Sequence, residues 1–329
     1  MEKFFIAMPA RPQRADYFPQ DCIDALEKMG SVAWNPYDRK LTEEELVELA
    51  GDATILLTHW MCPQVNSLFL DAAPQLKLIA HCAGTVAHIA SEETYRRGIP
   101  CLSANPIMAK YVAEGVLGLI LASLRGIKEE DLSLQRGKWG GKAHCVSLFD
   151  CTVGLVGLGA VGRNLLNLLT PFQPKVKIYD PYLAADGLAP WSFAEAADLD
   201  TVMGCDVVTI HASQTPETYH MIDAQAFSKM KDHAVFINTA RASLVDTDAA
   251  VAAMSTGRIR GAIDVYDSEW CPQPQWAGMD NVILQPHVAG RPSGAGMTRA
   301  IVADIQRFLN GDPIELGVSY TQFSHMTQE

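Results

Sequence analysis

Short apolar runs alternate with amphipathic segments along the first hundred residues of the chain. Apolar residues recur at helical spacing over 16–29, 42–50 and 65–72, which predicts three helices. Thr42 followed by Glu45 forms a capping box, which marks the start of the second helix. The apolar runs between and around these helices predict strands at 4–8, 31–34, 54–57, 77–80 and 100–102. This alternation is typical of βαβ units and predicts a parallel sheet.

After residue 104 the helical segments lengthen before a second alternating series begins. A strongly apolar helix is predicted over 109–125 and a more polar one over 128–136, and a glycine-rich stretch follows. Strands are predicted from Thr152 onward and at 175–179, 206–210, 234–238, 261–265 and 281–284. A last helix follows Pro292 and runs to Asn310, and the polar tail over 319–329 is predicted to be disordered.

One turn carries the clearest chemical signal. The apolar run 152–156 leads directly into Gly157-Leu158-Gly159-Ala160-Val161-Gly162, and Asp180 follows 18 residues after the last glycine (180 − 162). The glycines allow a tight turn, close approach of a pyrophosphate and close packing of the helix on the sheet. The helix that begins near Ala160 and Val161 would direct its free N–H groups at the phosphates. An acid at Asp180 would accept the ribose hydroxyls and repel a 2′-phosphate, so NAD is predicted rather than NADP. The alternative is an ordinary strand–helix turn.

The order of these segments predicts an α/β protein with two Rossmann-like domains, each built on a parallel sheet. The NAD-binding domain, 105–291, is inserted into a split substrate (catalytic) domain made of 1–104 and 292–329. The first part has the βαβ pattern but no phosphate-binding loop of its own.

Composition narrows the partners and the compartment. The 329 residues are 48% hydrophobic and 19% charged, as in folded globular proteins, and the net charge of −12 argues against nucleic acid and anionic membranes. No uninterrupted apolar run reaches the roughly 18 residues of a membrane span. The N-terminal strand ends too soon, at Pro9, to be a signal peptide. Eight scattered cysteines without C-x-x-C or zinc spacing predict reduced thiols, no metal site and a cytoplasmic location.

Three ionisable residues directly follow strands in the second half: Arg241, Glu269 and His287. Ligands of open α/β sheets bind at the carboxyl ends of strands, so we expect these side chains to share a site. A nicotinamide would supply a hydride to a 2-keto acid, and a histidine can donate the proton that the carbonyl oxygen needs. A carboxylate orients the histidine and favours its charged form, and an arginine binds the substrate carboxylate or carbonyl. Each residue alone is more often a surface or packing residue, but together they indicate hydride transfer.

The motifs together resemble the D-isomer-specific 2-hydroxyacid dehydrogenases, most strongly from Val112 to Gly290. The stretches that carry the resemblance are 156–162, Asn238-Thr239-Ala240-Arg241, 264–269 and Pro286-His287-Val288-Ala289-Gly290, with Val112-Ala113-Glu114 and Gly137-Lys138-Trp139 as further landmarks. Relatives include glycerate and phosphoglycerate dehydrogenases and glyoxylate or hydroxypyruvate reductases.

The resemblance implies roles for several residues. Arg241 would bind the substrate, Glu269 would be the acid partner, and His287 would be the acid/base. Asp264 would hold the nicotinamide carboxamide, and His211, Thr239 and Ala240 would line the cofactor cleft. It also implies a homodimer built around roughly 114–150, acting on a small anionic 2-keto or 2-hydroxy acid.

The substrate pocket departs from the family pattern. The loop that usually binds the substrate carboxylate corresponds to 81–89, where Ala83, Gly84 and Thr85 are the pocket candidates and one glycine remains. Trp270 replaces the usual proline, Ala242 replaces a glycine, and Met108-Ala109 replaces Asn-Ala. These departures predict an uncommon substrate, bulkier than glyoxylate or pyruvate. Further pocket candidates are Arg11, Arg14, His59, Trp60, His81 and Arg291. For the loop arginines the alternative is a solvated surface position.

Two other functions are weighed against the dehydrogenase. The first is an NAD(H)-sensing interaction protein similar to transcriptional corepressors, which would have little turnover. The second, formate oxidation, is disfavoured because those enzymes pair their histidine with a glutamine, whereas this chain has Glu269.

Overall fold

The computed structural model describes residues 1–141, 143–184, 186–324 and 326. The chain divides into two compact units, unit 1 (Met1–Ala109 with Pro292–Glu329) and unit 2 (Lys110–Arg291). The sequence placed the first boundary between 104 and 105, at the start of helix α6 (Asn105–Leu124), whereas the structure divides the chain within that helix. The second boundary lies between Arg291 and Pro292.

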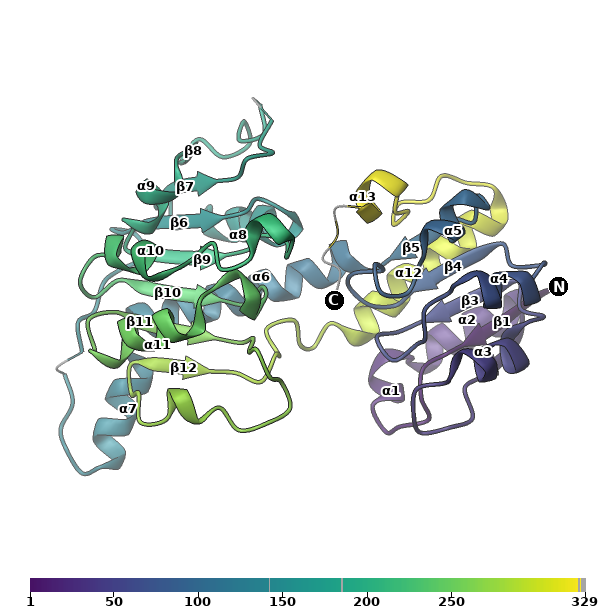
Figure 1. Ribbon diagram of the computed structural model, residues 1–329, viewed down its shortest axis with the longest axis horizontal. Coiled ribbons are helices and arrows are strands. Elements are labelled where there is room, and N and C mark those ends of the chain that lie inside the picture. The colour runs from purple at the N-terminus through teal and green to yellow at the C-terminus, as the bar shows by residue number, and fades with distance from the viewer. Residues whose placement is uncertain (142, 185, 325, 327–329) are drawn as a thin grey trace. The chain divides into compact units, whose positions relative to one another are not determined.

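Unit 1 contains a five-stranded sheet of order β2-β1-β3-β4-β5, in which every pair of strands is parallel (Figure 1). The strands are β1 (Glu2–Ile6), β2 (Gly30–Trp34), β3 (Ile55–Thr58), β4 (Leu78–His81) and β5 (Cys101–Ser103). The helices are α1 (Arg14–Tyr17), α2 (Gln20–Met29), α3 (Glu43–Ala50), α4 (Ser67–Ala72), α5 (Glu92–Arg96), α12 (Gly294–Asn310) and α13 (Tyr320–Ser324). The predicted capping box at the start of α3 is confirmed, since the Glu45 N–H bonds to the Thr42 hydroxyl and the Thr42 N–H bonds to the Glu45 carboxylate.

The single helix predicted over 16–29 is wrong. The structure has two helices, α1 and α2, separated by Phe18 and Pro19. Proline disfavours helical backbone in the residue before it, and Phe18 accordingly leaves the helical region at φ −115°, ψ 78°.

Unit 2 contains a seven-stranded parallel sheet of order β12-β11-β10-β9-β6-β7-β8 (Figure 1). Its strands are β6 (Thr152–Val156), β7 (Lys175–Tyr179), β8 (Ala194–Ala196), β9 (Val207–Ile210), β10 (Val235–Asn238), β11 (Arg260–Ile263) and β12 (Val282–Leu284). Besides most of α6, its helices are α7 (Ile127–Gln135), α8 (Ala160–Leu169), α9 (Leu199–Met203), α10 (Ala224–Lys229) and α11 (Thr247–Ser255). The strand order reverses between β6 and β9, which is where doubly wound sheets bind their ligands. The sequence did not predict β8, a short edge strand with half-buried and exposed residues only.

Apolar layers cover both faces of each sheet, as parallel sheets require. In β4, Ile79 packs into one layer of unit 1, while Leu78 and Ala80 pack into the other. In β6, Val153 and Leu155 pack into one layer of unit 2 and Val156 into the other. The backbones of both sheets are therefore held rigidly, and their carboxyl edges can position side chains.

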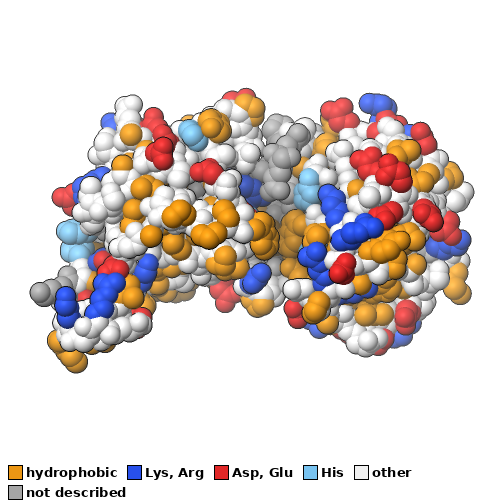
Figure 2. Space-filling model, turned by 60° about the horizontal axis from the view of Figure 1, so that its bottom comes forward, with side chains coloured by type: hydrophobic (Ala, Val, Ile, Leu, Met, Phe, Trp, Pro, Cys, Tyr) orange, Lys and Arg blue, Asp and Glu red, His pale blue; other side chains and the backbone are white. Residues whose placement is uncertain are grey.

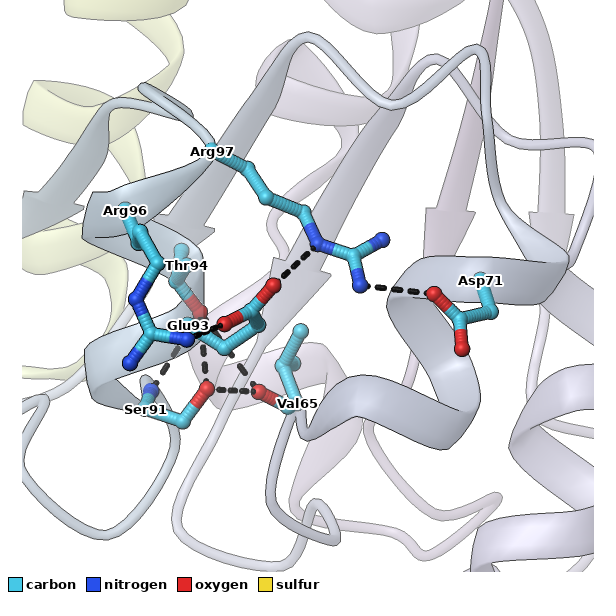
Figure 3. A network of polar contacts seen from close by, with 7 residues as sticks. All are labelled: Val65, Asp71, Ser91, Glu93, Thr94, Arg96 and Arg97. Atoms are coloured by element: carbon cyan, nitrogen blue, oxygen red, sulfur yellow. Dashed lines mark hydrogen bonds and ion pairs between the residues drawn. The ribbon is translucent and has the colours of Figure 1, made fainter.

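A polar network holds α4 and α5 around the segment that follows β4 (Figure 3). The Arg97 guanidinium bonds to Asp71 at 2.6 Å and to Glu93 at 2.8 Å. The Ser91 hydroxyl donates to the carbonyl of Val65 at 2.7 Å. These contacts fix the end of the loop that leads from β4 into α5 and join α5 to α4.

Helix α6 is long and apolar enough to cross a membrane by length and composition, with a mean hydropathy of 1.6 over its best window. Lys110 and Glu114 interrupt its apolar residues, so the sequence contains no uninterrupted apolar run of membrane-spanning length here. One side of the helix, including Val116 and Ile120, packs into the core of unit 2. Such a partly buried apolar helix is typical of the core of an α/β domain.

The prediction of a disordered tail is wrong for the described part of it. The N–H of Val318 donates to the carbonyl of Cys101, and Gly317 pairs antiparallel with Leu102 of β5. Phe323 of α13 is 6% exposed and packs on Tyr95 with ring centroids 4.9 Å apart. Phe323, together with the partly buried Met326, anchors this mostly polar segment to unit 1.

We predict that Phe323→Ala lowers the free energy of unfolding by about 3 kcal/mol, because it leaves a cavity in a packed layer. Tyr320→Ala, at a side chain in the same helix that is 50% exposed, should have a much smaller effect. Thermal and urea denaturation would measure both variants. Equal stability of Phe323→Ala and the wild type would show that the tail does not contribute to the fold.

Candidate functional site

The glycine turn after β6 has the geometry of a phosphate-binding turn. Gly157 adopts φ +92°, and a side chain there would lie 2.7 Å from the backbone nitrogen of Ala212. A side chain at Gly162 would lie 2.9 Å from the carbonyl oxygen of Gly157. Gly159 is exposed, and a side chain there would meet nothing within 4 Å. Two glycines are therefore required by the fold, whereas Gly159 only keeps its surroundings open.

The amino end of α8 offers backbone donors that have no partner among the described residues, beside this open space. The first N–H groups, those of Ala160, Val161 and Gly162, precede the first intrahelical bond, which runs from Arg163 to the carbonyl of Gly159. No side chain caps this ten-residue helix. The N–H groups and the helix dipole together favour an anion such as a pyrophosphate.

Asp180 follows β7 and supports the same turn. One of its carboxylate oxygens accepts a hydrogen bond from the N–H of Leu158 at 2.7 Å, and the other accepts from the N–H of Tyr182 at 2.8 Å. Asp180 also lines an open pocket of about 510 Å³, together with Ile178, Pro181, Leu183, Leu188 and Ala197. The carboxylate thus lies between the glycine turn and a largely apolar pocket of ligand size.

On the other side of β6, His211 follows β9 and Thr239 and Ala240 follow β10. The His211 ring bonds to the Thr209 hydroxyl at 3.0 Å, and burial lowers its pKa to about 4, so the ring is neutral at pH 7. The Thr239 hydroxyl is buried and has no hydrogen-bond partner among the described residues.

Asn238, the last residue of β10, holds the turn that carries Arg241. Its side-chain oxygen accepts from the N–H of Ala240 at 3.1 Å, and its amide nitrogen donates to the carbonyl of Arg241 at 3.0 Å. The half-buried Arg241 guanidinium donates to the carbonyl of Ala240 at 2.8 Å. Asn238 belongs to a motif recognised in the sequence, but no role was predicted for it. The only local signal for a role is that an Asn often stabilises the turn that follows it.

His287 and Glu269 are in direct contact. The Nδ1 atom of His287 lies 2.7 Å from a carboxylate oxygen of Glu269, and both side chains remain partly exposed. His287 adopts φ +53°, a backbone conformation that is uncommon for residues other than glycine and that recurs at functional sites. Because Nδ1 faces Glu269, Nε2 is the nitrogen left to act on a ligand.

Asp264 holds the backbone on which His287 stands. It is 1% exposed, and its two oxygens accept from the N–H groups of Val288 and Ala289 at 2.7 and 3.0 Å. Its own carbonyl accepts from the N–H of His287 at 2.8 Å. Burial raises the pKa of this carboxyl, while the two N–H donors act in the opposite direction. The structure thus shows a positioning contact that the sequence did not predict.

The pocket candidates of unit 1 fall into two groups. His59 and His81, at the ends of β3 and β4, are buried, as are Ala83 and Gly84, while Thr85 is half-buried and Trp60 is exposed. The second group, Arg11 and Arg14, donates to backbone carbonyls of residues 8–9 and 35–38. Arg11 donates to the carbonyl of Asp38, and Arg14 donates to the carbonyls of Met8, Pro9 and Asn35 and stacks on Trp34. Arg291, the last residue of unit 2, is exposed.

The prediction that Arg14 binds a second acidic group is weakened by these contacts. Three of its five N–H donors serve backbone carbonyls, and burial lowers its pKa. Arg14 therefore fastens the loop after β1.

Comparison with known proteins places this site in a family. The family described as D-isomer specific 2-hydroxyacid dehydrogenase, NAD binding domain, matches residues 117–289. A glyoxylate reductase of Thermofilum pendens is 35% identical over 278 residues, which is 82% of this chain and 80% of the relative. A D-3-phosphoglycerate dehydrogenase of Methanocaldococcus jannaschii is 31% identical over 305 residues, which is 91% of this chain but 57% of that longer protein.

Solved structures agree with the sequence comparison. The crystal structure of a phosphoglycerate oxidoreductase from Rhizobium etli superimposes with a TM-score of 0.80 at 26% identity, covering 97% of this chain and 99% of that one. The predicted fold class, two α/β units with parallel sheets, is confirmed. The chain belongs to the D-isomer specific 2-hydroxyacid dehydrogenase family and is an NAD-dependent oxidoreductase of that family.

Proposed function

We propose that this enzyme interconverts a small anionic 2-keto acid and the corresponding D-2-hydroxy acid, with His287 as acid/base, Glu269 as its partner and Arg241 as the substrate-binding arginine. The observation that carries this proposal is the 2.7 Å contact between His287 Nδ1 and Glu269. It lies at the carboxyl edge of unit 2, where Arg241, Glu269 and His287 follow the neighbouring strands β10, β11 and β12.

The residues present fit NAD. The open space over Gly159 and the unpaired N–H groups of α8 suit the pyrophosphate, and Asp180 suits the adenosine ribose. Each oxygen of Asp264 has a second lone pair, so the same carboxylate can also accept the nicotinamide carboxamide. When bound, the nicotinamide would supply or accept the hydride.

The side chains would divide the remaining work. Glu269 fixes the tautomer and direction of the imidazole, which leaves Nε2 of His287 to give a proton to the carbonyl oxygen or take it from the alcohol. Arg241 would bind the substrate carboxylate through its planar, permanently charged guanidinium. Asp264 keeps the His287 backbone in place during proton transfer.

The unit 1 candidates Arg11, His59, Trp60, Ala83, Gly84 and Thr85 are proposed to lie near the substrate, and of these His59 has the most informative surroundings.

An NAD(H)-sensing interaction protein with little turnover is the second candidate function, because it could keep the same cofactor residues. Turnover separates the enzyme from the sensor: NADH binding without reduction of any 2-keto acid would favour the sensor.

The free thiols of all eight cysteines support a reducing, cytoplasmic location.

We predict that His287→Ala lowers kcat/KM for 2-keto acid reduction by about 10³-fold, because proton donation is lost. Arg241→Ala should act mainly on KM, and Glu269→Gln should lower kcat about tenfold or more through a misoriented imidazole. NADH oxidation with a panel of 2-keto acids measures all three, and His233→Ala, at an exposed histidine, is the control. Full turnover by His287→Ala would overturn the assignment.

We predict that two glycines of the turn respond differently to alanine. Gly159→Ala should leave the melting temperature unchanged, because a side chain there meets no protein atom within 4 Å, yet weaken NADH binding about tenfold or more. Gly157→Ala should lose about 2 kcal/mol of stability as well, from positive φ and backbone contact. Calorimetry of unfolding and NADH titration test this pair. Wild-type affinity in Gly159→Ala would refute the pyrophosphate position.

We also propose a homodimer formed through α6, α7 and the segment 137–150. Large apolar side chains are exposed in α7, namely Ile127 and Leu134, and in the segment that follows it, namely Trp139 and Phe149. Figure 2 shows apolar side chains at the tip of the projection on the left, where Figure 1 places α7. Large exposed apolar side chains that gather in a patch are typical of a protein–protein interface, and the exposed Ile127 and Leu134 of α7 support this proposal.

We predict that the wild type sediments as a dimer and that Ile127→Glu combined with Leu134→Glu sediments as a monomer, because charges would be buried in the interface. Leu168→Glu, at a leucine of α8 that is 36% exposed, is the matched control and should leave the dimer intact. Sedimentation velocity is the measurement. A monomeric wild type, or a dimeric double variant, would contradict this interface.

A further inference from the structure

Three histidines gather at the carboxyl edge of the unit 1 sheet. His59 follows β3, His81 ends β4, and His88 lies in the loop after β4. Thr58 and His81 are paired neighbours in the sheet, and the Thr58 hydroxyl bonds to Nδ1 of His81 at 2.9 Å. The rings of His81 and His88 are in edge contact, with centroids 5.7 Å apart. This edge is where an α/β sheet places its ligands.

His59 is the histidine with unused hydrogen-bonding capacity. It is 7% exposed, and neither of its ring nitrogens has a hydrogen-bond partner among the residues that the structure describes. Tyr17 and Trp60 pack edge-on against its ring, with centroids 4.5 and 4.6 Å away. Trp60 is 38% exposed, so solvent reaches the aromatic cover of His59. Buried polar groups are normally paired, and an unpaired donor and acceptor favour a ligand that can satisfy both.

The imidazoles of His59 and His81 are uncharged at pH 7. Burial lowers its pKa to about 4, and the nearby His88 lowers it further. Burial likewise lowers the pKa of His81 well below its usual range. The guanidinium groups of Arg11 and Arg14 donate to the carbonyls of Asp38, Met8, Pro9 and Asn35. Among the described residues the three histidines do not form a metal-binding group.

We propose that His59, covered by Tyr17 and Trp60, binds the side chain of the substrate and selects 2-keto and D-2-hydroxy acids that carry an uncharged hydroxyl group. This inference rests on the proposed dehydrogenase function. A neutral imidazole has one N–H donor and one lone pair, and a hydroxyl group can satisfy both. The aromatic rings of Tyr17 and Trp60 would enclose the carbon that bears the hydroxyl.

The same neutrality disfavours a charged side chain. A phosphate or second carboxylate would be desolvated beside the nitrogen lone pair of His59, which carries no balancing charge, while Arg11 and Arg14 serve backbone carbonyls, and such desolvation is costly. The two named relatives differ on this point, because one is a glyoxylate reductase and the other a D-3-phosphoglycerate dehydrogenase. The surroundings of His59 favour neither a substrate without a side chain, such as glyoxylate, nor a substrate with a phosphorylated side chain.

The test compares three 2-keto acids that differ only at the side chain: glyoxylate, hydroxypyruvate and 3-phosphohydroxypyruvate. The wild type should prefer hydroxypyruvate. His59→Phe, which keeps a ring but removes both nitrogens, should raise KM for hydroxypyruvate about tenfold or more, as sites built for a hydroxyl do when the pair is broken. Its kcat/KM for glyoxylate should fall much less, since glyoxylate has no side chain to bind, so the ratio of kcat/KM for hydroxypyruvate to that for glyoxylate should drop about tenfold or more. His59→Asn, which restores a donor and an acceptor, should recover part of the loss.

A measurement on the wild type guards against misfolding of the variants. With histidines labelled with ¹⁵N, addition of D-glycerate to the NADH complex should shift the His59 ring resonances, and addition of glycolate, which lacks the side chain, should not. A purely structural histidine would respond equally to both ligands.

The outcomes separate this inference from the function on which it rests. If His59→Phe lowers activity equally with glyoxylate and hydroxypyruvate, or changes neither, or if the wild type prefers the phosphorylated acid, the selectivity role is overturned while the dehydrogenase stands. If the wild type reduces no 2-keto acid at all, the proposed function fails first, and this inference fails with it.

Discussion

The carboxylate of Asp264 is the interaction on which the chemistry of unit 2 depends. It is buried at the end of β11, and its two oxygens hold the N–H groups of Val288 and Ala289 beyond the end of β12. His287, with φ +53°, would not keep that conformation in a free loop, because the left-handed region is unfavourable for residues with a side chain. The Asp264 contacts offset this strain and thereby direct the imidazole toward Glu269.

A second constraint acts on the same segment from α6. A side chain at Gly115 would lie 2.5 Å from the carbonyl oxygen of Ala289, so only glycine lets the helix approach this closely. The backbone next to His287 is therefore fixed in two ways. The Asp264 carboxylate bonds to it, and the absence of a side chain at Gly115 lets α6 pack directly against it. Such support is typical of sites whose geometry must be kept to fractions of an ångström.

Sequence reasoning succeeded where the signal was local and failed where it depended on tertiary contacts. The spacing of Gly157, Gly159 and Asp180 follows from the turn itself, and the structure shows the open position, the unpaired helix N–H groups and the carboxylate together. The contact of Glu269 with His287 could be expected because both residues lie in the segments that follow neighbouring strands, β11 and β12. The Asp264 contacts depend on the detailed path of a loop 24 and 25 residues away, which no spacing rule encodes. The same limit explains Phe323, whose partner Tyr95 is remote in the chain.

The two units carry different electrostatics, and this difference has a consequence for how the enzyme can vary. Unit 2 presents an arginine, a glutamate and a histidine at its strand ends, whereas the carboxyl edge of unit 1 presents buried histidines kept neutral by desolvation. Under the proposed function, hydride and proton transfer would need the histidine, glutamate and arginine of unit 2, while discrimination among substrate side chains would need only shape and neutral hydrogen bonds. The two sets lie on separate sheets with separate cores, so a substitution at the end of β3 is expected to leave the contacts of His287 unchanged. The proposed choice of acid and the proposed reaction would therefore be separable by mutation.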